Sequence, residues 1–303
     1  MLSDKEIVCP NNLLDAAHQK KGVSAGIVNA GKLITMMSVM DAVNENLIIP
    51  IFIGDQEEIE KCALDLNFDI SSFDIIDEKE ENKTSIIAAE LASKEKIKII
   101  VKGHIHTDVL MREVIKKKYN LIGKTRLSHI WHMTLDKQDK PLIITDGALN
   151  VSPNVKTKMH ILKNVINFCK RIGNERPKIS ILSATEEVLD SVQSSLDAKE
   201  ITELAKKENL SADVFGPLAF DNSISKKSAE IKGITNIVAG NADVLLVPSV
   251  ESGNALVKIM VYFMGACAAG VVVGGKVPIV ITSRSDVATA RLASIAAAVV
   301  ALD

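Results

Sequence analysis

A polar turn at residues 283–286 places a hydroxyl, a guanidinium and a carboxylate within four positions of the chain. An apolar run precedes this turn and an alanine-rich stretch follows it, which predicts a strand, a turn and a helix. A helix N-terminus carries free N–H groups and a positive potential, so an arginine placed there is repelled unless an anion binds beside it. We therefore expect Ser283, Arg284 and Asp286 to form a catalytic centre that binds phosphate. Two alternatives stay open: Arg284 in a surface ion pair, and Asp286 as the N-cap of the helix.

A second polar turn, at residues 248–254, follows another apolar run and leads into a helix that we expect to begin near Ala255. Gly253 permits a close approach of the backbone to a ligand, and Asn254 can cap the helix. Lys258 lies one turn further along. The segment is a candidate anion site, and the alternative is an ordinary capped loop.

A third combination, at residues 101–112, again predicts a strand, a glycine turn and the start of a helix. Lys102 and Arg112 are candidates to bind phosphate groups. His104 and His106 share one face of an extended segment, so a metal site has to be considered. No carboxylate or cysteine stands nearby at a matching ligand spacing, and we predict no metal.

The elements that must position these turns alternate between short apolar runs and longer helical patterns, which is typical of βα units. The fold class predicted is therefore α/β, doubly wound, with mostly parallel sheets. A polar segment at residues 136–141 marks either a domain edge or the tip of a hairpin. Strands are expected at residues 23–28, 48–53, 74–76, 97–101, 142–145, 178–182, 244–247 and 278–282. Helices are expected at residues 32–46, 84–94, 155–171, 200–208 and 287–302.

Composition narrows the class of protein. Hydrophobic residues make up 47% of the 303 residues and aromatic residues only 3%, as in buried parallel sheets. The net charge of −2 favours neither a nucleic-acid nor a membrane partner. The four cysteines form no close pair and the N-terminus has no apolar signal region, so we expect a cytoplasmic protein. Residues 259–275 carry no charge, but glycines interrupt them, and we interpret them as a buried helix followed by a buried strand.

Four segments together resemble the phosphate acetyltransferase and phosphate butyryltransferase family. They lie in the family's order between about residues 100 and 290. The length and the runs Gly-Pro-Leu-Ala-Phe-Asp-Asn and Ser-Arg-Ser-Asp are more similar to the butyryltransferase branch. The segments are Lys-Gly (102–103) through Thr107 to Leu-Met-Arg (110–112); Asp-Gly-Ala-Leu-Asn (146–150) with Pro153; Gly-Pro-Leu-Ala-Phe-Asp-Asn (216–222); and Gly-Asn-Ala-Asp (240–243) through Pro248, Gly-Asn (253–254) and Lys258 to Ser-Arg (283–284).

The resemblance implies two α/β domains of the isocitrate and isopropylmalate dehydrogenase type, with the active site in the cleft between them. The expected domains are residues 1–125 with 272–303, and residues 126–271. The implied substrates are an acyl-CoA, most simply butyryl-CoA with acetyl-CoA as the alternative, and inorganic phosphate. No further cofactor is implied, and a homodimer or higher homo-oligomer is expected. The residues implied in substrate binding are Lys102, Thr107, Arg112, Asn222, Ser252, Gly253, Asn254 and Lys258.

The mechanism we expect is direct acyl transfer in a ternary complex. Asp286 would be the base for the CoA thiol, whose ordinary pKa is about 8.5, and Ser283 would donate to the oxyanion or to the sulfur. Arg284 and Arg112 would hold the phosphate. An acyl-enzyme on Cys267 is not favoured, because this cysteine lies in an apolar stretch typical of a buried thiol. Two more distant alternatives are an NAD-dependent decarboxylating dehydrogenase and a non-catalytic regulatory module.

Overall fold

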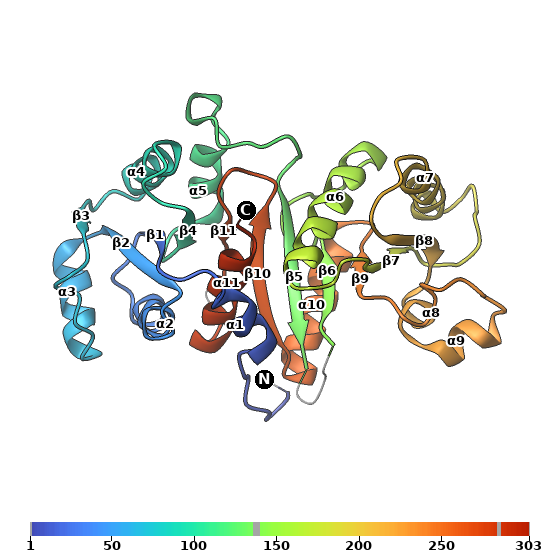
Figure 1. The fold of residues 1–303 in the computed structure, drawn as a ribbon, viewed down its shortest axis with the longest axis horizontal. Coiled ribbons are helices and arrows are strands. Elements are labelled where there is room, and N and C mark those ends of the chain that lie inside the picture. Colours follow the sequence, from blue (N-terminus) through green and yellow to red (C-terminus); the bar gives the residue numbers. More distant parts are fainter. Residues whose placement is uncertain (1, 136–139, 284–285, 303) are drawn as a thin grey trace. The chain divides into compact units, whose positions relative to one another are not determined.

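The structure is a computed structural model that describes residues 2–135, 140–283 and 286–302. The chain divides into two compact units (Figure 1). The terminal unit consists of Ile7–Lys124 with Ala269–Asp303, and the middle unit consists of Met1–Glu6 with Thr125–Ala268. In each unit helices pack on a mostly parallel set of strands, so the predicted α/β class is confirmed.

The terminal unit is built on strands in the order β3-β2-β1-β4-β11-β10, of which only β10 is antiparallel to its neighbour in this set. The strands are β1 (Val23–Val28), β2 (Ile48–Gly54), β3 (Ile75–Asp77), β4 (Ile99–Lys102), β10 (Cys267–Val273) and β11 (Ile279–Val280). The helices are α1 (Asn11–Ala17), α2 (Leu33–Asn44), α3 (Gln56–Asp65), α4 (Glu81–Ser93), α5 (Thr107–Val114), the 3-10 turn η1 (Lys117–Tyr119) and α11 (Ala288–Val300).

The middle unit has the strand order β5-β6-β9-β7-β8, in which β5 and β6 form an antiparallel hairpin and the other pairs are parallel. The strands are β5 (Ser128–Thr134), β6 (Leu142–Thr145), β7 (Lys178–Leu182), β8 (Asp213–Leu218) and β9 (Val244–Leu246). The helices are α6 (Val155–Arg171), α7 (Gln193–Lys207), α8 (Phe220–Ile224), α9 (Lys226–Ile231) and α10 (Val250–Met264). Of the polar segment at 136–141, for which a domain edge or a hairpin tip was expected, residues 136–139 lie outside the described part.

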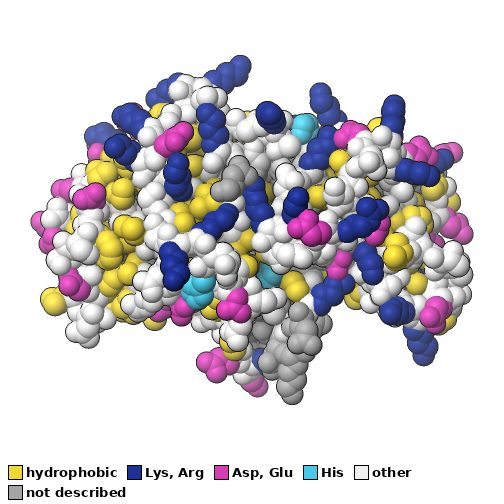
Figure 2. All heavy atoms as spheres, viewed as in Figure 1, with side chains coloured by type: hydrophobic (Ala, Val, Ile, Leu, Met, Phe, Trp, Pro, Cys, Tyr) yellow, Lys and Arg dark blue, Asp and Glu magenta, His cyan; other side chains and the backbone are white. Residues whose placement is uncertain are grey.

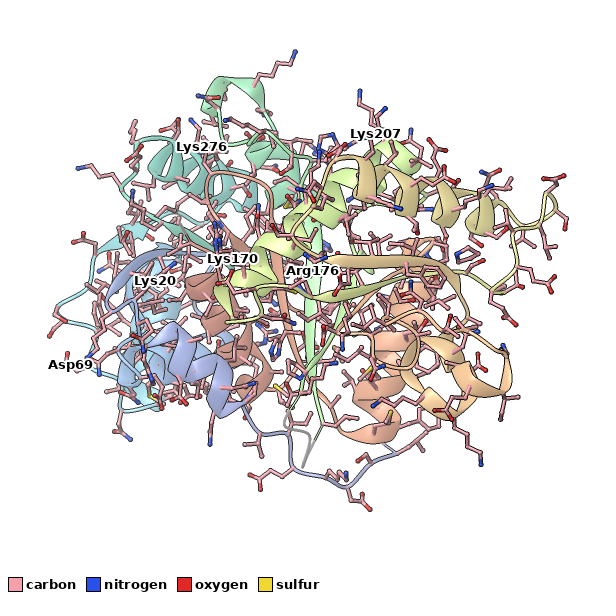
Figure 3. All side chains as sticks on the ribbon, turned by 45° about the vertical axis from the view of Figure 1, so that its right-hand side comes forward. Lys20, Asp69, Lys170, Arg176, Lys207 and Lys276 are labelled. Carbon is pink, nitrogen blue, oxygen red and sulfur yellow. The ribbon has the colours of Figure 1, made fainter. Side chains whose placement is uncertain are left out.

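Helix α11 is the most buried helix of the terminal unit, because every residue from Ala290 to Val300 is buried. A helix that is apolar all round has to be covered on all sides, and α11 packs against α1, α2, β4 and β11. The amine of Lys20, labelled in Figure 3, donates to the carbonyl of Leu302 just beyond the helix. Helix α11 is thus held against the sheet of the terminal unit.

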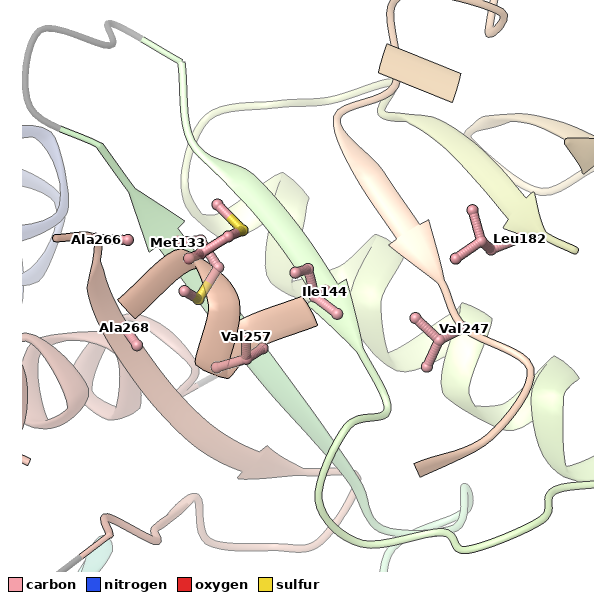
Figure 4. Packing of buried hydrophobic residues seen from close by; sticks show 8 residues of the cluster. Met133, Ile144, Leu182, Val247, Val257, Ala266 and Ala268 are labelled. Atoms are coloured by element: carbon pink, nitrogen blue, oxygen red, sulfur yellow. The ribbon is translucent and has the colours of Figure 1, made fainter. Parts of the chain in front are cut away.

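In the middle unit a cluster of buried side chains from β5, β6, β7, α10 and the residues at the end of β9 and the start of β10 forms a core (Figure 4). Its central members include Met133, Ile144, Val247 and Val257. Basic and acidic side chains are interspersed over the face drawn in Figure 2, as a net charge of −2 leads one to expect. Within the described ranges, none of the helices is both long enough and apolar enough to span a bilayer.

Several predicted helices and strands match the observed residue ranges, and others do not. The strands at 23–28, 142–145 and 178–182 and the helix at 155–171 are confirmed in full. Residues 259–275 are, as expected, the end of a helix and a buried strand. The strand at 278–282 is reduced to two residues, and β5, β8, α1 and α3 had no prediction. β8 contains Gly216 and Pro217, which ordinarily argue against a strand.

The loops after β1 and β4 are joined backbone to backbone. Gly103 N–H donates to Val28 O at 2.8 Å, and His104 N–H donates to Asn29 O at 3.0 Å. A Cβ atom on Gly103 would lie 2.5 Å from both acceptor carbonyls, closer than any side chain tolerates. The approach of the two loops therefore requires glycine at this position.

We expect Gly103→Ala to lower the free energy of unfolding by about 3 kcal/mol, the upper range of overpacking, because the atoms in the way are backbone. Gly26→Ala is the matched control on β1: its Cβ would meet side-chain atoms alone, of which the flexible Ile97 Cδ1 is the nearest, at 2.6 Å. Urea unfolding monitored by circular dichroism measures both variants. Equal losses in the two variants would contradict the role of the joined loops.

The buried ring of His132 predicts a dependence of stability on pH. Burial lowers the pKa of His132 from 6.5 to about 4. Between these two values the unfolded chain binds a proton that the folded chain does not, so stability falls as the pH drops through this window. The loss amounts to about 3 kcal/mol over the window.

We expect His132→Phe to flatten this part of the stability profile, because phenylalanine keeps a buried ring that does not titrate. Urea unfolding at pH 7 and at pH 4.5 measures the difference. His104→Gln, which removes an exposed histidine, is the control and should keep the slope of the parent protein. A parent-like slope in His132→Phe would refute the assignment.

Candidate active site

Parallel pairing gathers three loops at one edge of the terminal unit's sheet. β1, β4 and β11 are parallel neighbours, with Ile279 opposite Ile100 and Val280 opposite Val101. The loops that follow these strands therefore leave the sheet on the same side. Ligands of open α/β sheets bind at this carboxyl edge. Two of the three loops carry residues predicted for catalysis or phosphate binding.

The turn that contains Ser283 and Asp286 is closed by two reciprocal hydrogen bonds. Ser283 N–H donates to the Asp286 carboxylate at 2.6 Å, and Asp286 N–H donates to Ser283 O at 3.2 Å. Ser283 is exposed and Asp286 is half-buried. The structure thus brings a hydroxyl-bearing residue and a carboxylate together at the sheet edge. Arg284, the third predicted catalytic residue, lies outside the described residues.

The helix that follows begins one residue later than expected. Val287 occupies the N-cap position of α11, and Asp286 lies before it. The Asp286 carboxylate accepts from the turn itself, through Ser283 N–H. The interpretation of Asp286 as the N-cap residue is therefore wrong, because the turn takes up one more residue than the pattern suggested.

Arg291 had no predicted role, yet it contacts both ends of this turn. Its Nη2 donates to Ser283 O at 2.8 Å and its Nε donates to Asp286 O at 3.2 Å. Burial lowers the pKa of Arg291, and the charge of Asp286 opposes that shift. A signal was present in the sequence, since Arg291 is the one charged residue between Ala288 and Val300.

The other predicted residues of the terminal unit lie on β4 and α5. Lys102 is buried at the end of β4, with its amine 3.4 Å from Gly103 O. Thr107 is the exposed first residue of α5. Arg112 pairs with Asp108 at 3.2 Å on the surface of the same helix. An exposed pair of this kind is weak, so a phosphate group can replace the carboxylate as partner of Arg112.

In the middle unit α10 begins at Val250, so the expected start near Ala255 is wrong. Ser249 and Ser252 form a capping box, in which Ser252 Oγ accepts from Ser249 N–H at 3.3 Å. The prediction that Asn254 caps the helix is therefore also wrong, because the two serines cap it one turn earlier. Asn254 donates instead to Gly147 O at 3.4 Å.

Gly253 does allow a close approach, but to the backbone of the neighbouring loop. A Cβ on Gly253 would lie 2.7 Å from Gly147 Cα, so the two glycines pack directly on each other. Lys258 lies further along α10, where its side chain is exposed. The β6–α6 loop and the start of α10 are thus held side by side at the carboxyl edge of β6 and β9.

Asn222 is fully buried on α8. Its amide donates to the Glu186 carboxylate at 3.2 Å, and Lys232 contacts the same carboxylate at 3.1 Å. The hydrogen bond from Lys232 is the main cause of the lowered pKa of Glu186. Asn222 thereby ties the loops after β7 and β8 together, and a direct role in substrate binding stays a prediction.

Asp146 has the most completely satisfied carboxylate of the middle unit, although the sequence assigned it no role. One oxygen accepts from Ala148 N–H and Leu149 N–H at 3.0 and 2.9 Å. The other accepts from His129 N–H at 3.0 Å and from the Asn150 amide at 2.7 Å. A buried carboxylate with four donors is fully satisfied, and it fixes the shape of the loop that follows β6.

The cysteines and the histidines at residues 104 and 106 occupy different environments among the described residues. All four cysteines are unbridged, and Cys267 is buried. His104 and His106 are exposed loop residues, and no group of three potential metal ligands comes together in the part of the chain that is described.

Comparison with known proteins agrees with this chemistry. Residues 78–299 match the family described as "Phosphate acetyl/butaryl transferase". Phosphate acetyltransferase of Rickettsia felis is 38% identical over 93% of this chain and 82% of its own length. Phosphate butyryltransferase of Clostridium acetobutylicum is 33% identical over 95% of this chain and 96% of its own length. A branched-chain phosphotransacylase from Enterococcus faecalis V583 superimposes with a TM-score of 0.81 at 29% identity, covering 92% of this chain and 98% of that one.

The family model covers most of the chain, and curated relatives of both names match it over more than nine-tenths of its residues. The predicted site residues at the sheet edge include a hydroxyl and a carboxylate, groups that can serve as a hydrogen-bond donor and as a general base. The chain therefore belongs to the phosphate acetyl/butyryl transferase family, and it is a phosphate acyltransferase that acts on acyl-CoA and phosphate.

Proposed function

We propose that this enzyme is a phosphate butyryltransferase, which converts butyryl-CoA and phosphate into butyryl phosphate and CoA. The butyryltransferase of C. acetobutylicum supports this, because it matches along 96% of its own length. The branched-chain phosphotransacylase of E. faecalis, named for an acyl group other than acetyl, supports it through its 29% identity. The dehydrogenase and regulatory alternatives have no support once the family is known.

A phosphate acetyltransferase is the second candidate. It is favoured by the higher identity, 38%, to the acetyltransferase of R. felis. Relatives of both names lie close in identity, so the choice of acyl chain has to be made by measurement. Assembly as a homodimer and a cytoplasmic location stay predictions from the sequence.

The observation that carries the proposed mechanism is the closed turn with Ser283 and Asp286 at the sheet edge. A phosphate oxygen attacks the thioester carbonyl, and the Ser283 hydroxyl donates to the resulting oxyanion or to the sulfur. The carbon–sulfur bond then breaks and CoA leaves as the thiolate. In the reverse direction Asp286 removes the proton from the CoA thiol, whose ordinary pKa is about 8.5.

Phosphate is held in this proposal by the two arginines expected from the sequence. For Arg112 this role is supported by its exposed side chain and by the weak ion pair with Asp108, which phosphate can replace. For Arg284 it is supported by the place of this residue in the Ser-Arg-Ser-Asp motif. Lys102 at the end of β4 and Thr107 at the start of α5 supply further donors for the substrates in this proposal. Direct transfer needs no cofactor beyond the CoA ester, which is itself a substrate.

We expect Asp286→Asn to lower kcat by roughly a hundredfold to ten-thousandfold, the usual range for the loss of a general base. The asparagine Oδ1 can still accept from Ser283 N–H, so the turn and the melting temperature should change little. Consumption of the CoA thiol in the presence of butyryl phosphate, monitored with a thiol reagent, and thermal unfolding measure the two effects.

Asp69→Asn is the matched control. The carboxylate of Asp69, which is labelled in Figure 3, likewise accepts a hydrogen bond from a nearby backbone group, Ser71 N–H, at 3.0 Å. It should keep the parent kcat. Full turnover by Asp286→Asn would exclude Asp286 as the base.

The acyl preference is tested with acetyl-, propionyl-, butyryl-, isobutyryl- and hexanoyl-CoA, each with and without phosphate. Two buried methylenes contribute about 1.6 kcal/mol, so kcat/KM for butyryl-CoA should exceed that for acetyl-CoA by about fifteenfold. Release of CoA should depend on phosphate in every case. A preference for acetyl-CoA would favour the second candidate.

A further inference from the structure

Arg291 is a charged residue in a helix that is otherwise uncharged and buried. Only 6% of its surface is exposed, although arginine is almost never buried without partners. Its guanidinium stays protonated under all ordinary conditions. An apolar residue would pack well at this position of the helix, so packing in the core does not explain the arginine.

The contacts of Arg291 lead to the turn above the helix. Nη2 donates to Ser283 O and Nε donates to Asp286 O, which are the carbonyls of the first and last residues of the turn. A planar guanidinium is suited to such a bridge because its donors have a fixed spacing. Arg291 itself is rigid, because it lies on a helix whose following residues are all buried.

The same two residues are already joined from within the turn. Asp286 N–H and Arg291 both donate to Ser283 O, while the Asp286 carboxylate accepts from Ser283 N–H. The three contacts leave little freedom for the backbone at residues 283 and 286. The Arg291 side chain thus helps to fix the distance between the Ser283 hydroxyl and the Asp286 carboxylate.

We propose that Arg291 is a positioning residue, which holds Ser283 and Asp286 in the geometry that acyl transfer requires by bridging their carbonyls. This inference rests on the proposed roles of Ser283 and Asp286. Arg291 touches neither substrate in it and acts only through the turn. A shift of about 1 Å in a catalytic group lowers turnover by about a hundredfold, so even a small relaxation of the turn becomes measurable.

Two variants test the bridge. Arg291→Lys keeps the charge, but a single ammonium cannot reach both carbonyls with the same geometry. Arg291→Met removes the buried charge and keeps a similar volume, but it takes the guanidinium away from both carbonyls, so thermal unfolding is measured beside kcat. We expect both to lower kcat by about a hundredfold while KM for phosphate and for acyl-CoA stays within about threefold.

Ser294→Ala is the matched control on the same buried helix. Ser294 Oγ accepts from Gly270 N–H at 2.9 Å, so it supports β10 and makes no contact with residues 283 or 286 that the structure records. This variant should lose melting temperature and keep the parent kcat. If Arg291 only stabilises the fold, the activity of all three variants should instead fall in proportion to their loss of folded protein.

The outcomes are separable from those of the proposed function. Parent-like kcat in folded Arg291→Lys and Arg291→Met, together with a low kcat in Asp286→Asn, overturns the positioning role alone. Parent-like kcat in Ser283→Ala and Asp286→Asn overturns the proposed centre, and the positioning role with it. A fall of kcat in the Arg291 variants that is absent in Ser294→Ala supports the positioning role. This result does not depend on which acyl-CoA the enzyme prefers.

Discussion

The pairing of β11 with β4 is the constraint on which the rest of the candidate site depends. Two residues, Ile279 and Val280, lie in register with Ile100 and Val101, almost 180 positions earlier in the chain. Because the pair is parallel, the loops after both strands leave the sheet at the same edge. Without this short pairing, the Ser283 turn and the Lys102 loop would have no defined relation within the terminal unit.

The loops at the two sheet edges are held by two kinds of contact: close approach at glycines and hydrogen bonds to buried charged groups. Gly103 lets two loops touch backbone to backbone, and Gly253 and Gly147 do the same in the middle unit. The carboxylate of Asp146 gathers four donors, and the guanidinium of Arg291 bridges two acceptors. Glycine is needed where backbones meet, and buried charge is tolerated where every partner is supplied.

The sequence predicted best where one local signal dominated. Residues 23–28, 142–145 and 178–182 are apolar runs between turn residues, and their strand bounds are correct. Residues 155–171 show a clear helical period after Asn154, whose side chain caps the helix by accepting from Thr157 N–H. Where two signals competed, the prediction failed: Gly253 and Asn254 indicated a loop, but the Ser249 and Ser252 capping box had already started α10.

By itself the sequence determined the α/β class, the family and the residue types gathered around the Ser283 turn, because these depend on local pattern and on motifs in a given order. Only the tertiary structure decided what those residues contact. It placed Asp286 before the N-cap, turned Gly253 toward Gly147, and revealed Arg291 beneath the turn. Those contacts join residues that are distant in sequence or lie on different elements. The geometry of hydrogen bonds between such residues follows from tertiary packing, which a local sequence pattern does not predict.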